Sequence, residues 1–214
     1  MYLKDRESAA YLLLDKLKQY KGMNPLVAGI PRGAMSMAKI IADGLGGELT
    51  AVLVHKIPSP ENKEFAIGSV GISGHIHRDP YVYEYGIPDT YIDATALEQL
   101  DVLKKRKEQY KLGTPEYKDR IVLIVDDGIA TGATTKCAIH EVQAQKPRKI
   151  VVVAAVTSVE AASEIRPLVD ALIVLDRPRN FYSVGQFFAH FPQVTDEEVV
   201  RILRREDSSQ SQFY

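Results

Sequence analysis

Two adjacent carboxylates, Asp126 and Asp127, are the side chains of this sequence best placed to do chemistry. They follow an apolar, mostly β-branched run, Ile121 to Val125, which is typical of a strand buried on both faces of a parallel sheet. A short loop of glycine, alanine and threonine comes next and leads into a helical segment. We therefore predict a strand, a loop and a helix start. This arrangement binds phosphate because free N–H groups and the positive end of the helix dipole converge there.

The residues predicted to bind this phosphate are Ala130, Thr131, Gly132, Ala133 and Thr134. The two threonines add hydroxyl donors, and the glycine lets the backbone come close to an anion. The two aspartates cannot bind phosphate themselves, because an ionised carboxylate only accepts hydrogen bonds. They suit ribose hydroxyls or a hydrated Mg²⁺, so the predicted ligand is a sugar phosphate. The alternative is that Asp-Asp-Gly only shapes a turn; the strand before it and the Thr-Gly loop after it favour the phosphate site.

The stretch 121–134 resembles the phosphoribosyl-pyrophosphate (PRPP) motif of type I phosphoribosyltransferases. The resemblance implies Mg²⁺-dependent transfer of a phosphoribosyl group from PRPP to a nitrogen heterocycle, with release of pyrophosphate. It also implies that Asp126 and Asp127 act in catalysis and hold the metal through water or ribose hydroxyls. Enzymes of this fold that use hypoxanthine or guanine carry an aspartate where this chain has Ala130. That departure puts the use of 6-oxopurines in doubt.

Two basic positions are predicted to bind pyrophosphate. Arg32-Gly33 follows the first predicted strand, and a loop of N–H groups beside a guanidinium can hold several phosphate oxygens. The pair resembles the pyrophosphate loop of type I phosphoribosyltransferases, which implies a catalytic role for Arg32. The alternative is a tight turn with a solvated arginine. Lys56, after the second strand, is similar to a basic residue that these enzymes direct at pyrophosphate, and residues 64–70 resemble their flexible loop.

Nearly the whole chain is similar to a bacterial and archaeal subfamily of phosphoribosyltransferases whose acceptors are unassigned. The likeness includes Asp5-Arg6 near the start and, near the end, Phe181 to Val199 with its Asp-Glu-Glu-Val segment. We expect an acceptor base to stack on an aromatic ring of this carboxy-terminal region, Phe181 or Tyr182. The alternative, that these rings belong to the core, is equally open.

The order of predicted elements gives an α/β fold: an open, mostly parallel sheet flanked by helices, with a small hood built from the carboxy-terminal region and a flexible loop. Residues 1–214 are predicted to form a single phosphoribosyltransferase domain. Its core covers about 5–56 and 95–178, its flexible loop and ribbon about 57–94, and its hood and last helix about 179–205. Alternating stretches at 75–78 and 81–85 predict the β-ribbon. His75 and His77 would share one side of it, but no third metal ligand has a fitting spacing, which favours a solvated ribbon.

Composition narrows the class of protein. A hydrophobic content of 45% and a charged content of 26% are ordinary for a globular protein, and the net charge of −1 argues against nucleic acid as a partner. A single cysteine, the lack of a signal-peptide core and the lack of a membrane-length apolar run predict a cytoplasmic protein. The family resemblance favours a homodimer. A second function stays open, a PRPP-binding regulator of RNA or DNA without catalysis, although the retained Arg32-Gly33 pair favours the enzyme.

Overall fold

A five-stranded parallel sheet forms the centre of the computed structural model, which describes residues 2–63 and 65–204. Met1, Glu64 and the tail 205–214, which are parts of the expected domain and flexible loop, lie outside the described residues. The strands run in the order β2-β1-β6-β7-β8, and every neighbouring pair is parallel. Their bounds are β1 Leu26–Gly29, β2 Glu48–Ala51, β6 Ile121–Ile129, β7 Lys149–Thr157 and β8 Ala171–Asp176. The predicted open parallel sheet is confirmed.

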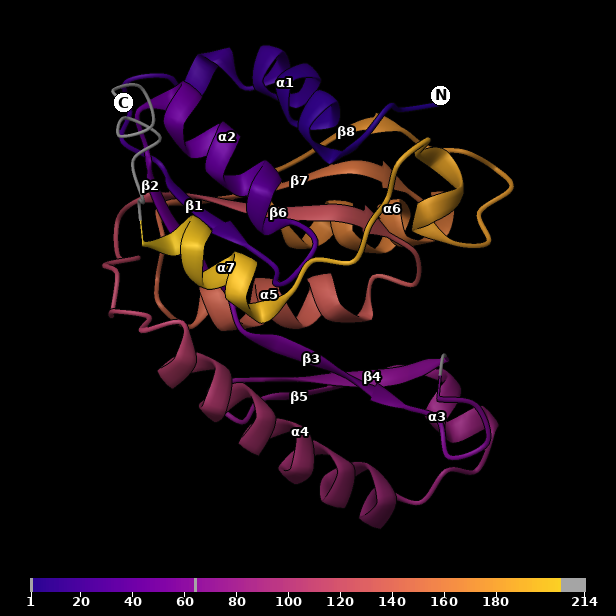
Figure 1. Ribbon diagram of the computed structural model, residues 1–214. Coiled ribbons are helices and arrows are strands. Elements are labelled where there is room, and N and C mark those ends of the chain that lie inside the picture. The colour runs from indigo at the N-terminus through magenta and orange to yellow at the C-terminus, as the bar shows by residue number, and fades with distance from the viewer. Residues whose placement is uncertain (1, 64, 205–214) are drawn as a thin grey trace.

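Helices cover both faces of this sheet (Figure 1). Leu123 and Val125 of β6 are buried in the cluster that contains one layer of helices, whereas Val122 and Ile124 are buried with the other layer. Successive side chains of a strand point to opposite faces, so burial on both faces explains the uninterrupted apolar run in the sequence. The first layer consists of α1 (Arg6–Lys16) and α2 (Met35–Leu45), and the second of α5 (Ala133–Gln143) and α6 (Val159–Ile165).

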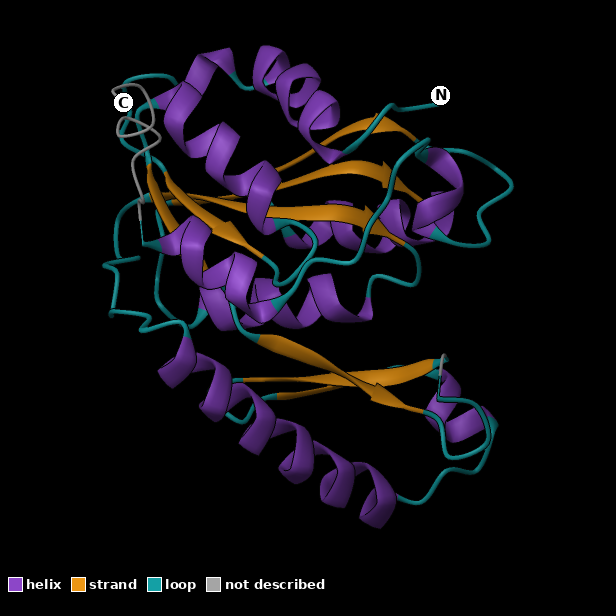
Figure 2. Cartoon of the chain, in the orientation of Figure 1, coloured by secondary structure: helices purple, strands orange, loops and turns teal. Residues whose placement is uncertain are grey.

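A second, antiparallel sheet follows β2 and lies beside the α5 layer (Figure 2). It contains β3 (Val54–Pro58), β4 (Ala66–Gly71) and β5 (Ile76–Arg78) in that order. The short helix α3 (Tyr81–Glu84) and the long helix α4 (Asp89–Gln109) complete this part, residues 54–110. From here on we call residues 54–110 the hood; they are a different part of the chain from the carboxy-terminal hood expected at about 179–205. Ile57, Val70 and Leu103 are buried together in its apolar cluster. The structure therefore builds an extra sheet from the middle of the chain, where the sequence indicates a loop and a ribbon.

Two local expectations differ from the structure. Residues 81–84 form α3, although their alternating pattern predicts a strand. Pro80 is tolerated in a first helical turn, and Tyr83 and Tyr85 are 72% and 69% exposed, so the alternation marks no buried sheet face. Helix α4 begins at Asp89 and packs on β3 and β4, whereas the expected division places residues from 95 onward with the core.

The carboxy-terminal segment crosses from β8 to α2 and ends between α2 and the hood (Figure 1). It contains a 3-10 helix, Val184–Phe187, which is tied to the amino-terminal segment by the Leu3 N–H bond to Phe187 O (2.8 Å). Its last helix, α7 (Asp196–Leu203), buries Val199 in the hood's apolar cluster. Two further 3-10 turns are Lys18–Tyr20 and Arg166–Leu168. Among the described helices, none has the length and apolar character needed to cross a membrane.

Candidate active site

Most of the predicted site residues meet at the carboxyl edge of the central sheet. A cavity of about 350 Å³ is lined there by the loop after β1, the end of β6, the loop that follows it and two parts of the hood. Strands β1 and β6 are hydrogen-bonded neighbours, so the loops that follow them lie side by side. The lining residues are Ile30, Pro31, Gly33, Lys56, Phe65, Ala66 and the continuous run 126–135. The phosphate loop and both aspartates thus share one cavity.

The phosphate loop is held in a conformation that opens its backbone to the cavity. Gly132 has a φ of +78°, a left-handed value that residues with a Cβ rarely adopt. Helix α5 begins at the next residue, and the first N–H groups of a helix have no partner within the helix. Ser158, after β7, donates from its hydroxyl to Ala130 O (2.7 Å) and fixes the start of the loop. These features suit an anion at the loop.

Asp126 lies inside the cavity on the last part of β6 and accepts a hydrogen bond at Oδ2 from the Thr135 hydroxyl (3.0 Å). Burial is the main cause that raises the pKa of this carboxyl, and the neighbouring charge of Asp127 adds to it, so that the pKa reaches about 7. The Thr135 bond opposes this shift. Burial and the charge of Asp127 therefore favour the protonated form of Asp126 more than in an exposed aspartate.

Asp127 is paired with an arginine from the opposite end of the sequence. Arg6 Nε and Nη2 each lie 2.8 Å from Asp127 Oδ2, and Nη1 donates to Pro192 O (2.7 Å). The guanidinium also stacks over the Phe191 ring, 3.6 Å from its centroid. Burial raises the pKa of Asp127, and the Arg6 charge and hydrogen bond limit that rise. Asp5-Arg6 enters the sequence reasoning only as a subfamily likeness, because a partner 121 residues away leaves no local signal.

The three predicted pyrophosphate residues divide into two groups. Gly33 and Lys56 line the cavity, and a Cβ at Gly33 would collide with Asp127 Oδ2. The loop therefore needs glycine to lie against the Asp127–Arg6 pair. The Arg32 side chain, after a cis peptide from Pro31, is not among the lining residues; its Nη1 lies 3.6 Å from Oδ2 of Asp196 on α7.

One aromatic residue that lines the cavity was not singled out from the sequence. This residue is Phe65, which directly precedes β4. Phe181 packs against the core cluster and lies 5.0 Å, centroid to centroid, from Phe187, whereas Tyr182 is 88% exposed. Neither of these two rings lines the cavity. Phe65 lies within residues 64–70, the stretch that resembles the flexible loop, and this was a signal for it. No sequence pattern, however, distinguishes an aromatic ring that lines a cavity from one that packs in the core.

The two aspartates fit a magnesium ion that arrives with a phosphorylated substrate. Mg²⁺ commonly binds one or two protein carboxylates, with water and substrate phosphates completing its ligands. Within residues 2–63 and 65–204, no group of three or more histidine, cysteine, aspartate or glutamate side chains could hold a metal by itself. The donor set therefore suits a substrate-borne ion.

A group of histidines lies on the hood side of α5. The His140 ring is 5.0 Å from that of His75 and 6.3 Å from that of His77, so the structure supplies the third ring that spacing alone did not reveal. His77 Nε2 is buried without a hydrogen-bond partner, and burial lowers the pKa of this ring to about 4. His77 and His140 are half-buried, whereas His75 is exposed, so only part of this side of the ribbon is solvated as expected.

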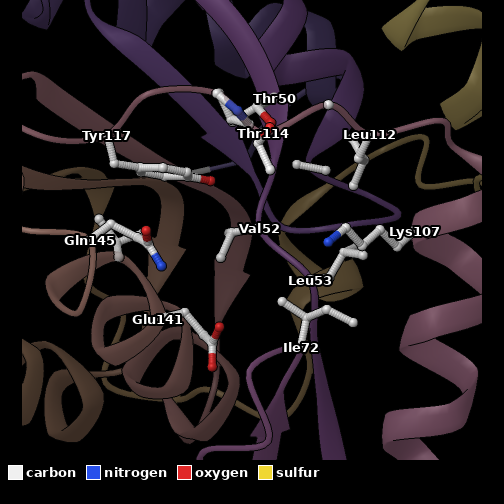
Figure 3. Close-up of a pocket in the computed structure, with 14 residues that line it drawn as sticks. Thr50, Val52, Leu53, Ile72, Lys107, Leu112, Thr114, Tyr117, Glu141 and Gln145 are labelled. Carbon is white, nitrogen blue, oxygen red and sulfur yellow. The ribbon is translucent and has the colours of Figure 1, made fainter.

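A second cavity, of about 200 Å³, lies at the junction of the central sheet and the hood (Figure 3). Tyr117 and Gln145 lie on one side of it and Lys107 on the other, with Glu141 at its base. The Glu141 carboxylate accepts hydrogen bonds from the Ser73 hydroxyl and N–H. This cavity shares no lining residue with the carboxyl-edge cavity and contains none of the predicted site residues, so we place the candidate active site at the carboxyl edge.

The parallel sheet and the loop geometry at its carboxyl edge are those of a nucleotide- or sugar-phosphate-binding α/β protein. Residues 4–186 match the model of the phosphoribosyl transferase domain, and the chain belongs to that family.

Individual relatives agree with this family. Two curated Mycobacterium tuberculosis proteins, from strains CDC 1551/Oshkosh and ATCC 25618/H37Rv, bear the names "Putative phosphoribosyl transferase MT0597" and "Putative phosphoribosyl transferase Rv0571c". Each is 33% identical over 204 residues, which is 94% of this chain and 46% of the relative. The chain thus spans about half the length of these relatives.

Solved structures show the same fold. The protein TT1426 from Thermus thermophilus is 39% identical, with a TM-score of 0.79 over 95% of this chain and 98% of that one. AQ2163 from Aquifex aeolicus is 16% identical, with a TM-score of 0.51 over 95% of this chain and 85% of that one, and shows likeness of fold alone.

Proposed function

We propose that this protein transfers a phosphoribosyl group from PRPP to a nitrogen heterocycle in a magnesium-dependent reaction that releases pyrophosphate. One observation carries the proposal: both aspartates, the phosphate loop, Gly33 and Lys56 line the same cavity. A sugar with a phosphate at one end and a diphosphate at the other needs donors at both ends and acceptors for hydroxyls between them. The residues that line this cavity include both kinds of group.

Each group has a proposed role in this reaction. Loop residues 130–134 bind the 5-phosphate through N–H groups and the Thr131 and Thr134 hydroxyls. Asp126 accepts hydrogen bonds from the ribose hydroxyls and stabilises positive charge that develops on the ring as the bond to pyrophosphate breaks. Asp127 contributes less charge because Arg6 partly neutralises it.

The leaving group is held on the other side of the cavity. The N–H of Gly33, Lys56 and the Arg32 guanidinium bind pyrophosphate and favour its departure. A bound Mg²⁺ would neutralise phosphate charge, with Asp126 and Asp127 as its protein-side ligands through water or hydroxyls. Closure of the hood residues Phe65 and Ala66 over the cavity would exclude water from the reactive carbon.

The acceptor is proposed to be a planar nitrogen heterocycle that stacks on Phe65 and that needs no proton exchange with residue 130. Ala130 has no titratable side chain, which disfavours 6-oxopurines. PRPP and this acceptor are the proposed small-molecule partners. A homodimer stays a prediction, which light scattering on the purified protein tests.

The experiment is to measure pyrophosphate release from PRPP and Mg²⁺ with a panel of purine, pyrimidine and other nitrogen heterocycles. We expect turnover with at least one base and a loss of at least about a hundredfold in Asp126→Asn and Asp127→Asn. PRPP binding without turnover on any acceptor would favour the regulator instead. Absence of PRPP binding by calorimetry would contradict the proposed site itself.

A further inference from the structure

The acidic segment at the start of α7 has no part in the reaction proposed above, yet one of its residues reaches the pyrophosphate loop. The Asp196 carboxylate is contacted by three side chains, one from the loop after β1 and two from the hood. Its Oδ2 lies 3.6 Å from Arg32 Nη1, its Oδ1 lies 3.5 Å from Arg106 Nε on α4, and it accepts a hydrogen bond from the Tyr110 hydroxyl. The carboxylate therefore joins the loop after β1 to the hood.

We propose that Asp196 is a positioning residue that holds Arg32 outside the cavity and competes with pyrophosphate for its guanidinium. The inference rests on the proposed function, because it concerns how that site takes up and releases pyrophosphate. Arg32 lies between Pro31 and Gly33, and both neighbours line the cavity. The Arg32 side chain is long, and we expect its rotation away from α7 to bring the guanidinium toward a ligand held in the cavity.

The Arg32–Asp196 ion pair is partly exposed to solvent, which makes it easier for Arg32 to leave Asp196 for another anion. The Arg32 and Asp196 side chains are 39% and 25% exposed, whereas those of Arg6 and Asp127 are 10% and 16% exposed. Exposed ion pairs contribute little and break readily, in contrast to buried ones. A pyrophosphate with several charged oxygens is a stronger partner for a guanidinium than one carboxylate.

Asp196 also keeps partners after Arg32 leaves. Arg106 and the Tyr110 hydroxyl remain bound to it, so release of Arg32 does not strand an unpaired carboxylate. Burial, together with Asp196, raises the pKa of Tyr110, and its hydroxyl therefore stays protonated as a donor. The hood thus holds Asp196 in place in both states, and only Arg32 has to move.

The direction of the effect separates competition from a merely structural role. Damage to the loop would weaken pyrophosphate binding, whereas removal of a competitor tightens it. By calorimetry with pyrophosphate and Mg²⁺, we expect Asp196→Asn to bind pyrophosphate about two- to fivefold more tightly than the wild type, as the usual strength of an exposed ion pair implies. In an Arg32→Ala background the same substitution should leave the affinity unchanged.

Two matched controls accompany this measurement. Glu197→Gln removes the same charge from the exposed neighbouring residue and should change the affinity by less than Asp196→Asn does. Tyr110→Phe removes a hood contact of Asp196 without touching Arg32, and should not tighten binding. NMR tests the Arg32–Asp196 contact without any ligand. The Arg32 Nε–H signal of the free protein should shift in Asp196→Asn and not in Glu197→Gln.

The outcomes distinguish this inference from the function on which it rests. Wild-type protein that binds pyrophosphate, with unchanged or weaker binding in Asp196→Asn, would overturn the competition alone. An unshifted Arg32 signal would do the same. Wild-type protein that binds neither PRPP nor pyrophosphate would overturn the proposed function and this inference with it.

Discussion

Arg6 and Asp127 stand 121 residues apart in the sequence and form a charge pair in the candidate active site, with two guanidinium nitrogens 2.8 Å from one carboxylate oxygen. Helix α1 supplies the cation and β6 the anion. The side chains are 10% and 16% exposed, so the pair is far less screened by solvent than a surface pair. Arg6 therefore fixes both the orientation and the charge of one of the two proposed catalytic acids.

Removal of Arg6 should cost stability in a pH-dependent way. We expect Arg6→Met to lower the free energy of unfolding by about 3 kcal/mol near neutral pH, because it leaves a largely buried carboxylate without its cation. The loss should shrink as the pH falls, because burial raises the pKa of Asp127 and a carboxyl that has lost its cation is then neutralised by a proton. Urea unfolding of Arg6→Met at several pH values measures this.

Two controls test the reason for that loss. Lys4→Met removes a cation from a side chain that is 84% exposed and should change stability little. Adding Asp127→Asn to Arg6→Met should restore part of the lost stability, because no charge is then left unpaired. Equal losses in Arg6→Met and Lys4→Met would contradict a special role for the buried pair.

Asp126 should make the stability of the folded protein depend on pH in a second way, with a sign that follows from its raised pKa. The pKa of its carboxyl is about 7 in the folded protein against an ordinary value of 3.8, so the folded state binds more protons than the unfolded state between these two values. Stability from this group is thus fully present below about pH 4 and is lost as the pH rises through about 7, by up to roughly 1.4 kcal/mol per pH unit.

Asp126→Asn removes this titration while its amide oxygen can still accept from Thr135. The melting temperature of the variant, relative to the wild type, should therefore be higher at pH 8 than at pH 5. Scanning calorimetry at both values checks this. A difference that stays constant, or that runs the other way, would show that the Asp126 pKa is not raised in the folded protein.

Gly33 should not tolerate even one methyl group. A Cβ there would meet Asp127 Oδ2, and the nearest Arg6 nitrogen would be 3.0 Å away. Either the loop or the charge pair must shift, and a misplacement of about 1 Å in an active site can cost about a hundredfold in rate. Pyrophosphate release by Gly33→Ala should fall by that order. Gly113→Ala is the matched control, because a Cβ at Gly113 meets nothing within 4 Å. Similar losses in both variants would reject the steric explanation.

The sequence was sufficient to propose those parts of the candidate site that one continuous segment builds. The strand, the aspartates and the phosphate loop lie within 121–134, and periodicity and loop chemistry are local properties. Residues that reach the site from elsewhere were not predictable in this way. The Arg6 pairing depends on how α1 packs on the sheet, and the Asp196 contact depends on where α7 ends its path beside the hood.

The arrangement of the hood was likewise not predictable from the sequence. Its strands are short, and the buried apolar residues Ile57, Ile67 and Val70 lie on two strands that a loop with proline and charged residues separates, so the sequence does not mark them as one sheet. Helix α4 buries Ile92, Ala96 and Leu103 on one side, a spacing that predicts a helix but not which sheet it covers. Phe181 and Tyr182 stay a prediction as base-stacking residues, although Phe65 lines the cavity and they do not.

The last prediction concerns the acceptor and decides between these rings. If Phe65 stacks on the base, Phe65→Ala should raise the KM for the acceptor about tenfold, from roughly 1.4 kcal/mol of lost stacking and burial. The KM for PRPP should change little, because the contacts proposed for the sugar phosphate are with other lining residues. Tyr182→Ala, which alters a ring that is 88% exposed, is the comparison variant. A rise in the acceptor KM for Tyr182→Ala with none for Phe65→Ala would assign the base to the carboxy-terminal segment instead.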